Sequence, residues 1–169
     1  MVETQPPREP RIRPARPEDV DAICEIAVRA WTPIMAERGA VMGEDLMRRE
    51  RGGDPLETKW KEVRDFCERW PDWVLVTEVE GRVVGFITFV PQEDSGLLSI
   101  GNNAIDPDDQ GLGLGTAQYE YLLDWAREKG FVYAKVMTGL DDCHASARAA
   151  YQKAGFDIAI PGVTYYRKL

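Results

Sequence analysis

Residues 97–130 read LLSIGNNAIDPDDQGLGLGTAQYEYLLDWAREKG, and this stretch organises the rest of the chain. A strand-like apolar run from Leu97 to Ile105 leads through an Asp-Pro turn into a loop with three glycines. A helix-like segment follows from about Thr116 to Lys129. Gly130 fits the C′ position of this helix, where glycine adopts a positive φ at little cost. The order therefore predicts a strand, a glycine loop and a helix.

The glycine loop predicts a site for a phosphate or pyrophosphate group. Gly111, Gly113 and Gly115 expose backbone N–H groups, because glycine has no Cβ to shield them. The helix start adds unpaired N–H donors and partial positive charge. A Walker A loop is excluded, because no lysine follows Gly115. The G-x-G-x-G spacing also differs from the G-x-G-x-x-G of dinucleotide-binding loops, so an enzyme that binds ATP or NAD here is disfavoured.

Two spaced motifs carry a resemblance to a known superfamily. Gln110-x-x-Gly113-x-Gly115 is similar to the acetyl-CoA pyrophosphate loop of the GCN5-related N-acetyltransferase (GNAT) superfamily, and the loop is preceded by that superfamily's hydrophobic-x-Pro. The segment from His144 to Phe156 resembles its Asn-x-x-Ala-x-x-x-Tyr-x-x-x-Gly-Phe motif. The resemblance covers roughly residues 11–167 and is strongest from Val83 to Phe156.

Composition narrows the classes of partner. The chain has 169 residues, enough for a single domain, and a formal net charge of −8. An acidic chain disfavours nucleic-acid partners and leans slightly towards a cationic substrate. Three widely spaced cysteines form neither a disulfide framework nor a metal-binding pattern, so no metal is expected. No signal core or membrane-length apolar run is visible, which predicts a cytoplasmic protein without membrane contact.

The N-terminal half predicts helices between two regions of sheet. Residues 1–10 are expected to be a flexible tail. Residues 11–169 are expected to form one domain that begins with a strand at Arg11–Ala15, and the resemblance implies that it is an N-acetyltransferase domain. A helix from Asp19 to Arg29 is expected to end at Trp31–Pro33. The next forty residues read as charged helices with glycine breaks, of which Leu56–Trp70 is the main one.

The C-terminal half predicts most of the sheet. Trp73–Val79 and Arg82–Val90 read as a tight hairpin around Glu80-Gly81. Phe131–Thr138 reads as a buried strand, and a short helix capped by Asp141 or Asp142 should follow it. Two last short strands are expected near Ile158 and Val163–Arg167.

This element order predicts an α/β (α+β) fold, with a mixed, mostly antiparallel sheet and helices on both faces. The resemblance implies an acyl-CoA N-acyltransferase-like fold in which Leu97–Ile105 and Phe131–Thr138 form a central splayed parallel pair. The arm of acetyl-CoA would lie in the splay. A bulge near Gly101 to Asn103 is expected, because glycine and asparagine tolerate unusual backbone angles.

Site residues are assigned by the resemblance. Acetyl-CoA is the expected cosubstrate. Its pantetheine and thioester would be held by Asn103, Ala104 and Ile105, its arm by His144, and its pyrophosphate by Gln110, Gly111, Leu112, Gly113, Leu114, Gly115 and Thr116. Tyr151 matches the tyrosine that commonly protonates the leaving thiolate, although it could simply be a core residue. Cys143 is disfavoured as a nucleophile.

The sequence does not identify the amine acceptor or the general base. The acceptor would be a small-molecule or peptide amine, with Trp31 and Met35 as pocket residues unless Trp31 only packs under its helix. Four carboxylates are base candidates, but each also reads as a surface charge: Glu78, Glu93, Asp94 and Asp106. The missing base keeps a rival open, a non-catalytic acyl-CoA-binding sensor or interaction module. The resemblance also allows a homodimer, but no interface is specified.

Overall fold

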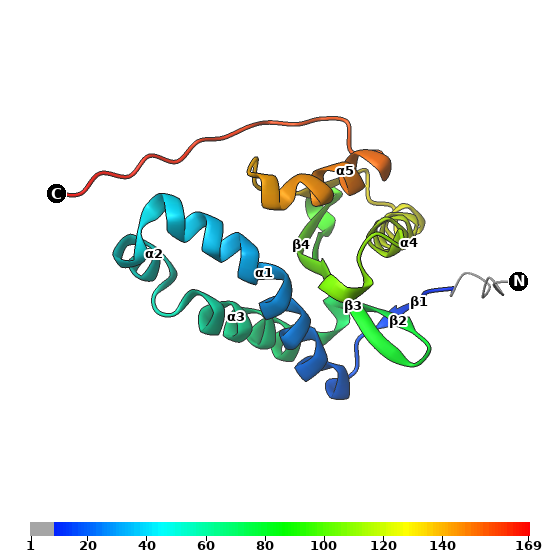
Figure 1. Ribbon diagram of the computed structural model, residues 1–169. Helices are drawn as coiled ribbons and strands as arrows, with labels where there is room; N and C mark the ends of the chain where they lie inside the picture. Colours follow the sequence, from blue (N-terminus) through cyan, green and yellow to red (C-terminus); the bar gives the residue numbers. More distant parts are fainter. Residues whose placement is uncertain (1–8) are drawn as a thin grey trace, which may run out of the picture.

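The protein, described here for residues 9–169 by a computed structural model, is a five-stranded sheet with helices on both faces (Figure 1). The strands, in sheet order, are β1 (Arg11–Pro14), β2 (Val74–Val79), β3 (Arg82–Gln92), β4 (Leu97–Ile105) and β5 (Tyr133–Val136). The α-helices are α1 (Val20–Met42), α2 (Glu44–Arg51), α3 (Pro55–Arg69), α4 (Leu114–Glu128) and α5 (Ala145–Lys153). Only β4 and β5 run parallel, so the predicted mixed, mostly antiparallel sheet is confirmed. Most of the expected tail, residues 1–8, lies outside the described residues.

Alternation along the strands gives the sheet two apolar faces. Val74 and Val76 of β2 pack with Val63 of α3 in a cluster that also takes in α1. Leu75, between them, belongs to the opposite cluster with Leu122 of α4. Successive side chains of a strand point to opposite faces, so one apolar run serves both cores. This explains why helices are needed on each side of the sheet.

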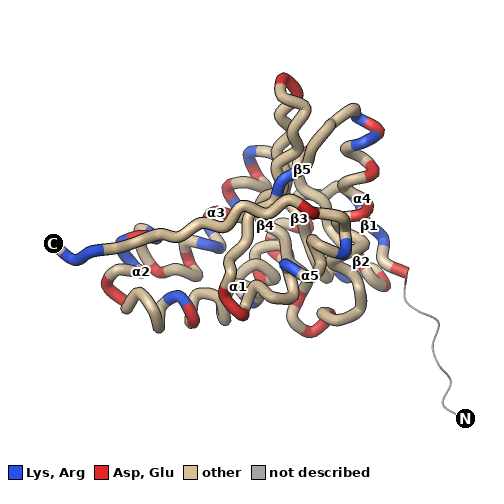
Figure 2. The backbone as a smooth tube through the Cα atoms, turned by 90° about the horizontal axis from the view of Figure 1, so that it is seen from above, with Lys and Arg blue, Asp and Glu red and all other residues tan. Residues whose placement is uncertain are grey.

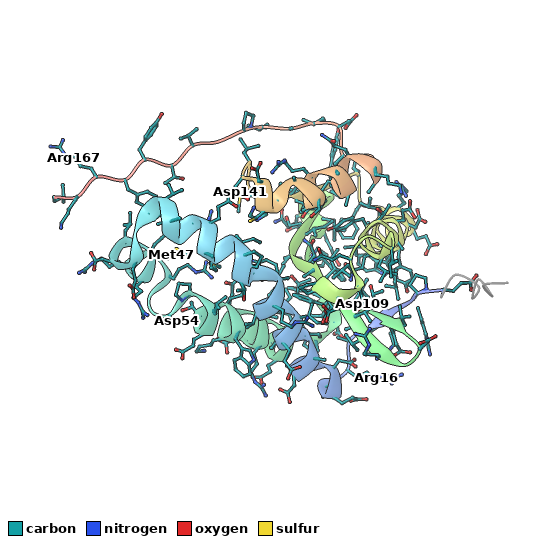
Figure 3. All side chains as sticks on the ribbon, in the orientation of Figure 1. Arg16, Met47, Asp54, Asp109, Asp141 and Arg167 are labelled. Carbon is teal, nitrogen blue, oxygen red and sulfur yellow. The ribbon has the colours of Figure 1, made fainter. Side chains whose placement is uncertain are left out.

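Helix α1 is longer than the sequence predicts. It does not end at Trp31–Pro33 but continues to Met42, with Pro33 inside it. A proline in a helix interior removes a hydrogen bond and costs about 3 kcal/mol. Met35, beyond the proline, is buried, and so is Met47 on the adjacent α2 (Figure 3). Burial of such side chains contributes about 1.5–3 kcal/mol each, which offsets the cost of the proline.

The hairpin and the main N-terminal helix agree with the sequence. Strands β2 and β3 are joined at Glu80 and Gly81, which have φ angles of 52° and 80°, as a tight two-residue turn requires. Helix α3 begins after Asp54, whose side chain accepts hydrogen bonds from the N–H groups of Leu56 and Glu57 at 3.0 and 3.1 Å. This N-cap fixes where α3 starts.

The end of the chain differs from the prediction. Strand β5 is shorter than Phe131–Thr138, and Val132 just before it is 72% exposed rather than buried. No strand forms near Ile158 or Val163–Arg167. Instead the chain after α5 runs in an extended path towards α2 (Figure 1), where Tyr166 donates a hydrogen bond to Glu50. Pro161 has no N–H for a ladder hydrogen bond, which disfavours a continuous strand in this segment.

A buried ion pair joins β1 to the start of α1. Asp19 accepts from the Arg13 guanidinium at 2.6 and 3.0 Å and from the Arg16 N–H at 2.7 Å. The Arg13 hydrogen bond outweighs burial and lowers the pKa of Asp19 below its ordinary 3.8. The pair therefore stabilises the fold fully above about pH 4, and this stabilisation is lost as the pH falls through the lowered pKa.

We expect Asp19→Asn to lower the free energy of unfolding at pH 7 by about 2–3 kcal/mol. This is less than the roughly 3–5 kcal/mol for breaking a fully buried pair, because Arg13 keeps its hydrogen bond to Glu78. Urea denaturation at pH 7, 5 and 3 measures the difference. It should stay constant down to about pH 4 and shrink below that. An equal difference at pH 3 and pH 7 would contradict the ion-pair explanation.

Candidate active site

A cavity of about 830 Å³ lies between β4, the start of α4, α5 and the helices α1 to α3. Leu112, which is 71% exposed, is the one sequence-predicted site residue that does not line it. The predicted residues that do line it are Trp31, Met35, Asn103, Ala104, Ile105, Gln110, Gly111, Gly113, Leu114, Gly115, Thr116, His144 and Tyr151. The fold therefore brings together residues from both halves of the chain.

The floor of the cavity is the part of β4 that extends past β5. Pairing between the two parallel strands ends at Ile100 and Val136, whereas β4 continues to Ile105. The predicted splay of this strand pair is thus confirmed. Within residues 9–169, no strand pairs with this side of Asn103 to Ile105. The Ile105 carbonyl accepts a hydrogen bond from Gln110 Nε2 at 3.1 Å, which ties the strand to the glycine loop.

The predicted bulge in β4 is present. Ile87 of β3 pairs with Asn103, but Phe89 pairs with Ile100, so β4 carries one extra residue here. The Thr88 hydroxyl donates to the Asn102 carbonyl at 3.1 Å across this irregularity. A Cβ on Gly101 would lie 2.7 Å from Thr88 Oγ1, so only glycine fits. The bulge changes the direction of β4 where it enters the cavity.

The glycine loop ends in an uncapped helix start. Gly113, with φ 78°, is the N-cap of α4, which begins at Leu114, slightly earlier than predicted. Glycine has no side chain to accept from the first-turn N–H groups, and this turn contains no acidic residue. Free N–H donors and the positive end of the helix dipole favour an anion. Gly115 and Thr116, in the first turn of this helix, line the cavity.

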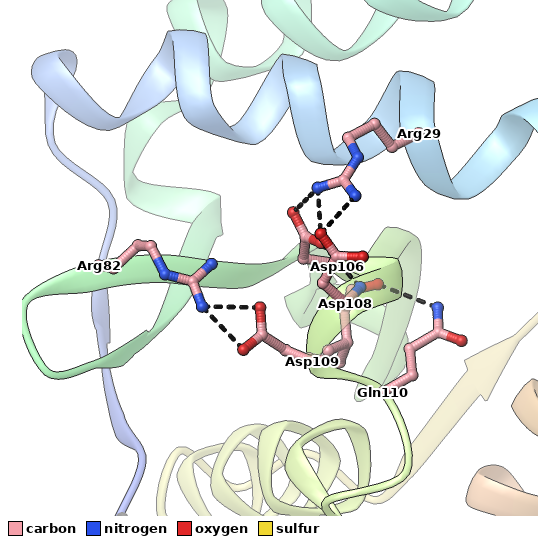
Figure 4. Close-up of polar contacts among 7 residues, drawn as sticks. Arg29, Arg82, Asp106, Asp108, Asp109 and Gln110 are labelled. Carbon is pink, nitrogen blue, oxygen red and sulfur yellow. Dashed lines mark hydrogen bonds and ion pairs between the residues drawn. The ribbon is translucent and has the colours of Figure 1, made fainter.

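The acidic turn before the loop is neutralised by two arginines. Arg29 of α1 donates to both Asp106 oxygens, at 2.7 and 2.6 Å, and to Asp108 at 2.8 Å (Figure 4). Arg82 of β3 donates to the two oxygens of Asp109 at 2.8 and 2.9 Å. Three carboxylates thus meet two guanidinium groups. An anion at the start of α4 therefore faces less repulsion than the sequence of this turn suggests.

Two tyrosine hydroxyls converge on one side chain of the bulge. Asn103 Oδ1 accepts from Tyr119 Oη at 2.6 Å and from Tyr151 Oη at 3.5 Å. Burial raises the pKa of Tyr151, although the hydrogen bonds to Asn103 and Tyr119 oppose this, and burial also raises the pKa of Tyr119. Both phenols are therefore protonated at neutral pH. Sequence reasoning missed Tyr119, which lies on the buried face of α4 together with Leu122.

His144 and Cys143 lie where α5 begins. Asp141 caps the turn by accepting from the His144 N–H at 3.1 Å, and its carboxylate lies 2.5 Å from His144 Nδ1. This fixes the imidazole at the cavity wall. A hydrogen bond to Glu37 raises the pKa of the Cys143 thiol to about 11. Little thiolate exists at neutral pH, so Cys143 is a poor nucleophile, as expected from the sequence.

The wall opposite the loop carries a polar cluster that sequence reasoning missed. Lys59 Nζ donates to Glu62 Oε1 at 3.0 Å and to Asn102 Oδ1 at 2.9 Å, and it lies 4.6 Å from the Trp31 ring centroid. Burial lowers the pKa of Lys59 against the attraction of Glu62. Lys59 is spaced four residues before the buried Val63. A lysine on the apolar stripe of a helix is unusual, and this position could have indicated from the sequence that Lys59 belongs to a site.

The base candidates taken from the sequence do not reach the cavity. Glu78 binds Arg13, and Asp106 binds Arg29. Glu93 and Asp94 lie in an exposed turn before β4. Glu62 does line the cavity, but it accepts three side-chain hydrogen bonds. Burial alone would raise the pKa of Glu62, but the hydrogen bond from Asn102 and the charge of Lys59 outweigh burial, so the pKa is lowered. A carboxylate with a lowered pKa is a weak base.

The sequence model of the acetyltransferase (GNAT) family matches residues 40–156, well over half of the chain. The chain belongs to this family. The matched part includes the bulge, the glycine loop and Tyr151, whereas the cavity-lining Trp31, Met35 and Arg38 precede it.

Three known proteins are similar to this chain, one in sequence and two in fold. The L-2,4-diaminobutyric acid acetyltransferase of Nocardia farcinica is 30% identical over 49% of this chain, and the match spans about half of that protein's length. A GNAT acetyltransferase from Brucella melitensis, solved with acetyl-CoA, has a TM-score of 0.59 and 21% identity, covering 94% of this chain and 97% of its own. The PaiA N-acetyltransferase of Thermoplasma acidophilum, solved with coenzyme A, has a TM-score of 0.64 and 16% identity, covering 89% and 91%.

Two further properties concern the described residues. No helix within residues 9–169 is both long and apolar enough to pass through a bilayer. The same residues contain no group of three or more His, Cys, Asp or Glu side chains arranged to hold a metal ion.

Proposed function

We propose that this GNAT family member transfers an acetyl group from acetyl-CoA to a primary amine by direct attack in a ternary complex. The observation that carries the proposal is the convergence on one cavity of an uncapped helix start, an unpaired strand edge and the Tyr151 hydroxyl. Each of these groups matches one requirement of the reaction. Acetyl-CoA supplies an activated acyl group as a thioester.

The chain's own donors fit such a cosubstrate. The N–H groups of Gly113 to Thr116 suit a pyrophosphate, because they lie at the start of α4, where no acidic residue and no side-chain cap compete for them. The free edge of Asn103 to Ile105 leaves backbone groups to pair with the amides of the pantetheine arm. A backbone N–H on this free edge would polarise the thioester oxygen. His144, held by Asp141, contacts the arm.

Tyr151 is the proposed general acid. The amine nitrogen attacks the thioester carbon, the carbon–sulfur bond breaks, and Tyr151 gives its proton to the thiolate. The amine must first lose a proton, which costs roughly 4–5 kcal/mol at neutral pH for a lysine-like group. The two carboxylates that line the cavity within the described residues are Glu62, which accepts three side-chain hydrogen bonds, and Asp109, which is paired with Arg82. We therefore assign this proton to water, and water returns a proton to Tyr151 after each turnover.

The acceptor is a small molecule or a peptide amine, with Trp31 and Met35 beside it. The Nocardia farcinica relative makes L-2,4-diaminobutyric acid the first amine to test. A cytoplasmic location fits three free cysteines.

Calorimetric titration tests the proposal against its rivals. We expect acetyl-CoA to bind with micromolar affinity, ATP and NAD not to bind, and CoA thiol to be released only when a suitable amine is present. Acetyl-CoA binding without release in a broad amine panel would favour the non-catalytic sensor. Folded protein that fails to bind acetyl-CoA would contradict both readings.

A further inference from the structure

We infer that the amine acceptor carries a carboxylate, which binds to Arg38 and Arg51 at the end of the cavity away from the glycine loop. This inference rests on the proposed function and deepens it by naming the class of acceptor. It draws on charges and unsatisfied donors that have no role in binding acetyl-CoA.

This end of the cavity is positive although the chain is acidic. Arg38 of α1, Arg51 of α2 and Lys59 of α3 line it, and Glu62 is the carboxylate among them. Three cations against one anion leave a local excess of positive charge, whereas the whole chain has a net charge of −8. Acidic and basic positions are mixed along α2 and α3 (Figure 2), so the sign depends on which side chains turn inward. An amine with no anionic group would be repelled here.

Two guanidinium groups retain donors for a ligand. Arg51 Nη2 donates to Glu62 Oε2 at 3.3 Å, but its Nε is buried and has no hydrogen-bond partner. Arg38 lines the cavity from an exposed position, and no hydrogen bond or ion pair joins its guanidinium to another of the described residues 9–169. A buried donor without a partner is unfavourable, and a carboxylate accepts two parallel hydrogen bonds from a guanidinium fork. A carboxylate at this position would satisfy Arg51 and pair with Arg38.

The hydrogen bonds around Glu62 also connect the arginine end of the cavity to the proposed reaction centre. Glu62 Oε1 accepts from Asn102 Nδ2 at 3.0 Å. The next residue, Asn103, accepts from Tyr151. A small acceptor with its carboxylate on the arginines can thus extend its amine along β4 towards Tyr151. Glu62 acts here as a positioning residue, because its oxygens hold Arg51 and Lys59 in place.

The cosubstrate does not account for these cations. Arg38, Arg51 and Lys59 come from the helices α1 to α3, whereas the anion site formed by the glycine loop opens α4 on the other side of the sheet's centre (Figure 1). If the arginines instead bound a phosphate of acetyl-CoA, their replacement would weaken acetyl-CoA binding. That outcome is measurable and would overturn the inference.

Two pairs of amines that differ only in a carboxylate, and a third pair that differs only in a phosphate, give the test. Acetyl-CoA-dependent CoA release is measured for L-2,4-diaminobutyrate against 1,3-diaminopropane, for L-ornithine against putrescine, and for O-phosphoethanolamine against ethanolamine. We expect kcat/KM to be about 10- to 100-fold higher for the best carboxylated amine than for its partner, as for charge-assisted hydrogen bonds. A preference for the phosphorylated member alone would show a phosphate site and overturn the carboxylate assignment.

Substitutions of the two arginines test whether they cause the preference for carboxylated amines. Arg38→Gln and Arg51→Gln should each raise KM for the carboxylated amine about tenfold or more, with little change for the decarboxylated partner or in the Kd of acetyl-CoA. Arg49→Gln is the matched control, because it removes the same charge from α2 at an exposed position whose partner is Asp45. Equal turnover within every pair, or carboxylated amines that neither react nor bind to the protein–CoA complex, would overturn the inference. Failure of the wild-type protein to bind acetyl-CoA would instead overturn the proposed function.

Discussion

Tyr151→Phe is expected to lower kcat for amine-dependent CoA release by about 10²- to 10⁴-fold, the usual contribution of a positioned general acid. The Kd of acetyl-CoA should stay unchanged, because the ring keeps its packing and only the hydroxyl is lost. Stopped-flow or steady-state detection of CoA thiol, with calorimetry for the Kd, measures both quantities. A variant that retains full kcat would contradict the assignment of Tyr151.

The pH dependence of the wild-type enzyme provides a second measurement of the same role. Burial raises the pKa of Tyr151 above its ordinary value of 10. The phenol therefore keeps its proton throughout the range in which the amine acceptor becomes neutral. We expect kcat/KM to rise with pH as the amine deprotonates and to show no alkaline decline below pH 10. A decline centred near pH 8 would point to a different acid.

Tyr119→Phe is the matched control for Tyr151→Phe. The two rings pack with centroids 5.1 Å apart, both are buried, and both hydroxyls reach Asn103. Removing the Tyr119 hydroxyl disturbs the same hydrogen-bond cluster without removing the proposed acid. We expect a loss in kcat of less than about tenfold, the scale of one neutral hydrogen bond. Equal losses in the two variants would assign a structural role to the cluster rather than acid catalysis to Tyr151.

The parts of this site that could be predicted from the sequence are those set by local chemistry. The Asp-Pro turn, the glycines of the loop and the apolar run from Leu97 to Ile105 specify their conformations within a few residues. The bulge was predicted because glycine and asparagine, at positions 101 to 103, tolerate unusual backbone angles. The short distance from a Cβ on Gly101 to Thr88 Oγ1 depends on a contact with β3 and could not be predicted. The parallel alignment of β4 with β5 came from the family resemblance, and the structure confirms it.

The remaining features depend on contacts between distant segments. Helix α1 continues past Pro33 because Met35 is buried, which a local reading of proline does not reveal. The net charge of −8 leaned slightly towards a cationic substrate, yet three cationic side chains gather at one end of the cavity. Whole-chain charge says little about a site whose sign depends on a few inward-facing residues. Lys59 differs from these features, because its position on the apolar stripe of α3 could be recognised from the sequence alone.

Gly115→Glu is expected to weaken acetyl-CoA binding by about 100-fold or more, because like charges brought together cost several kcal/mol. Gly115 lies in the first turn of α4 and lines the cavity. A glutamate there would also accept hydrogen bonds from the free N–H groups and so compete with the pyrophosphate. Calorimetric titration of acetyl-CoA into the folded variant measures the effect.

The choice of Gly115 separates loss of binding from loss of fold. Gly113 has a φ of 78°, so a side chain there would strain the backbone, whereas a Cβ on Gly115 would meet Ile105 Cγ1 at an ordinary 3.7 Å. A glutamate in the first turn of a helix is stabilising by roughly 0.3–1 kcal/mol, so the melting temperature should rise while affinity falls. Gly115→Gln, of the same size but neutral, should lose much less affinity. Equal losses for glutamate and glutamine would mean that the side chain blocks the site by volume, and the anion would then have to be placed elsewhere.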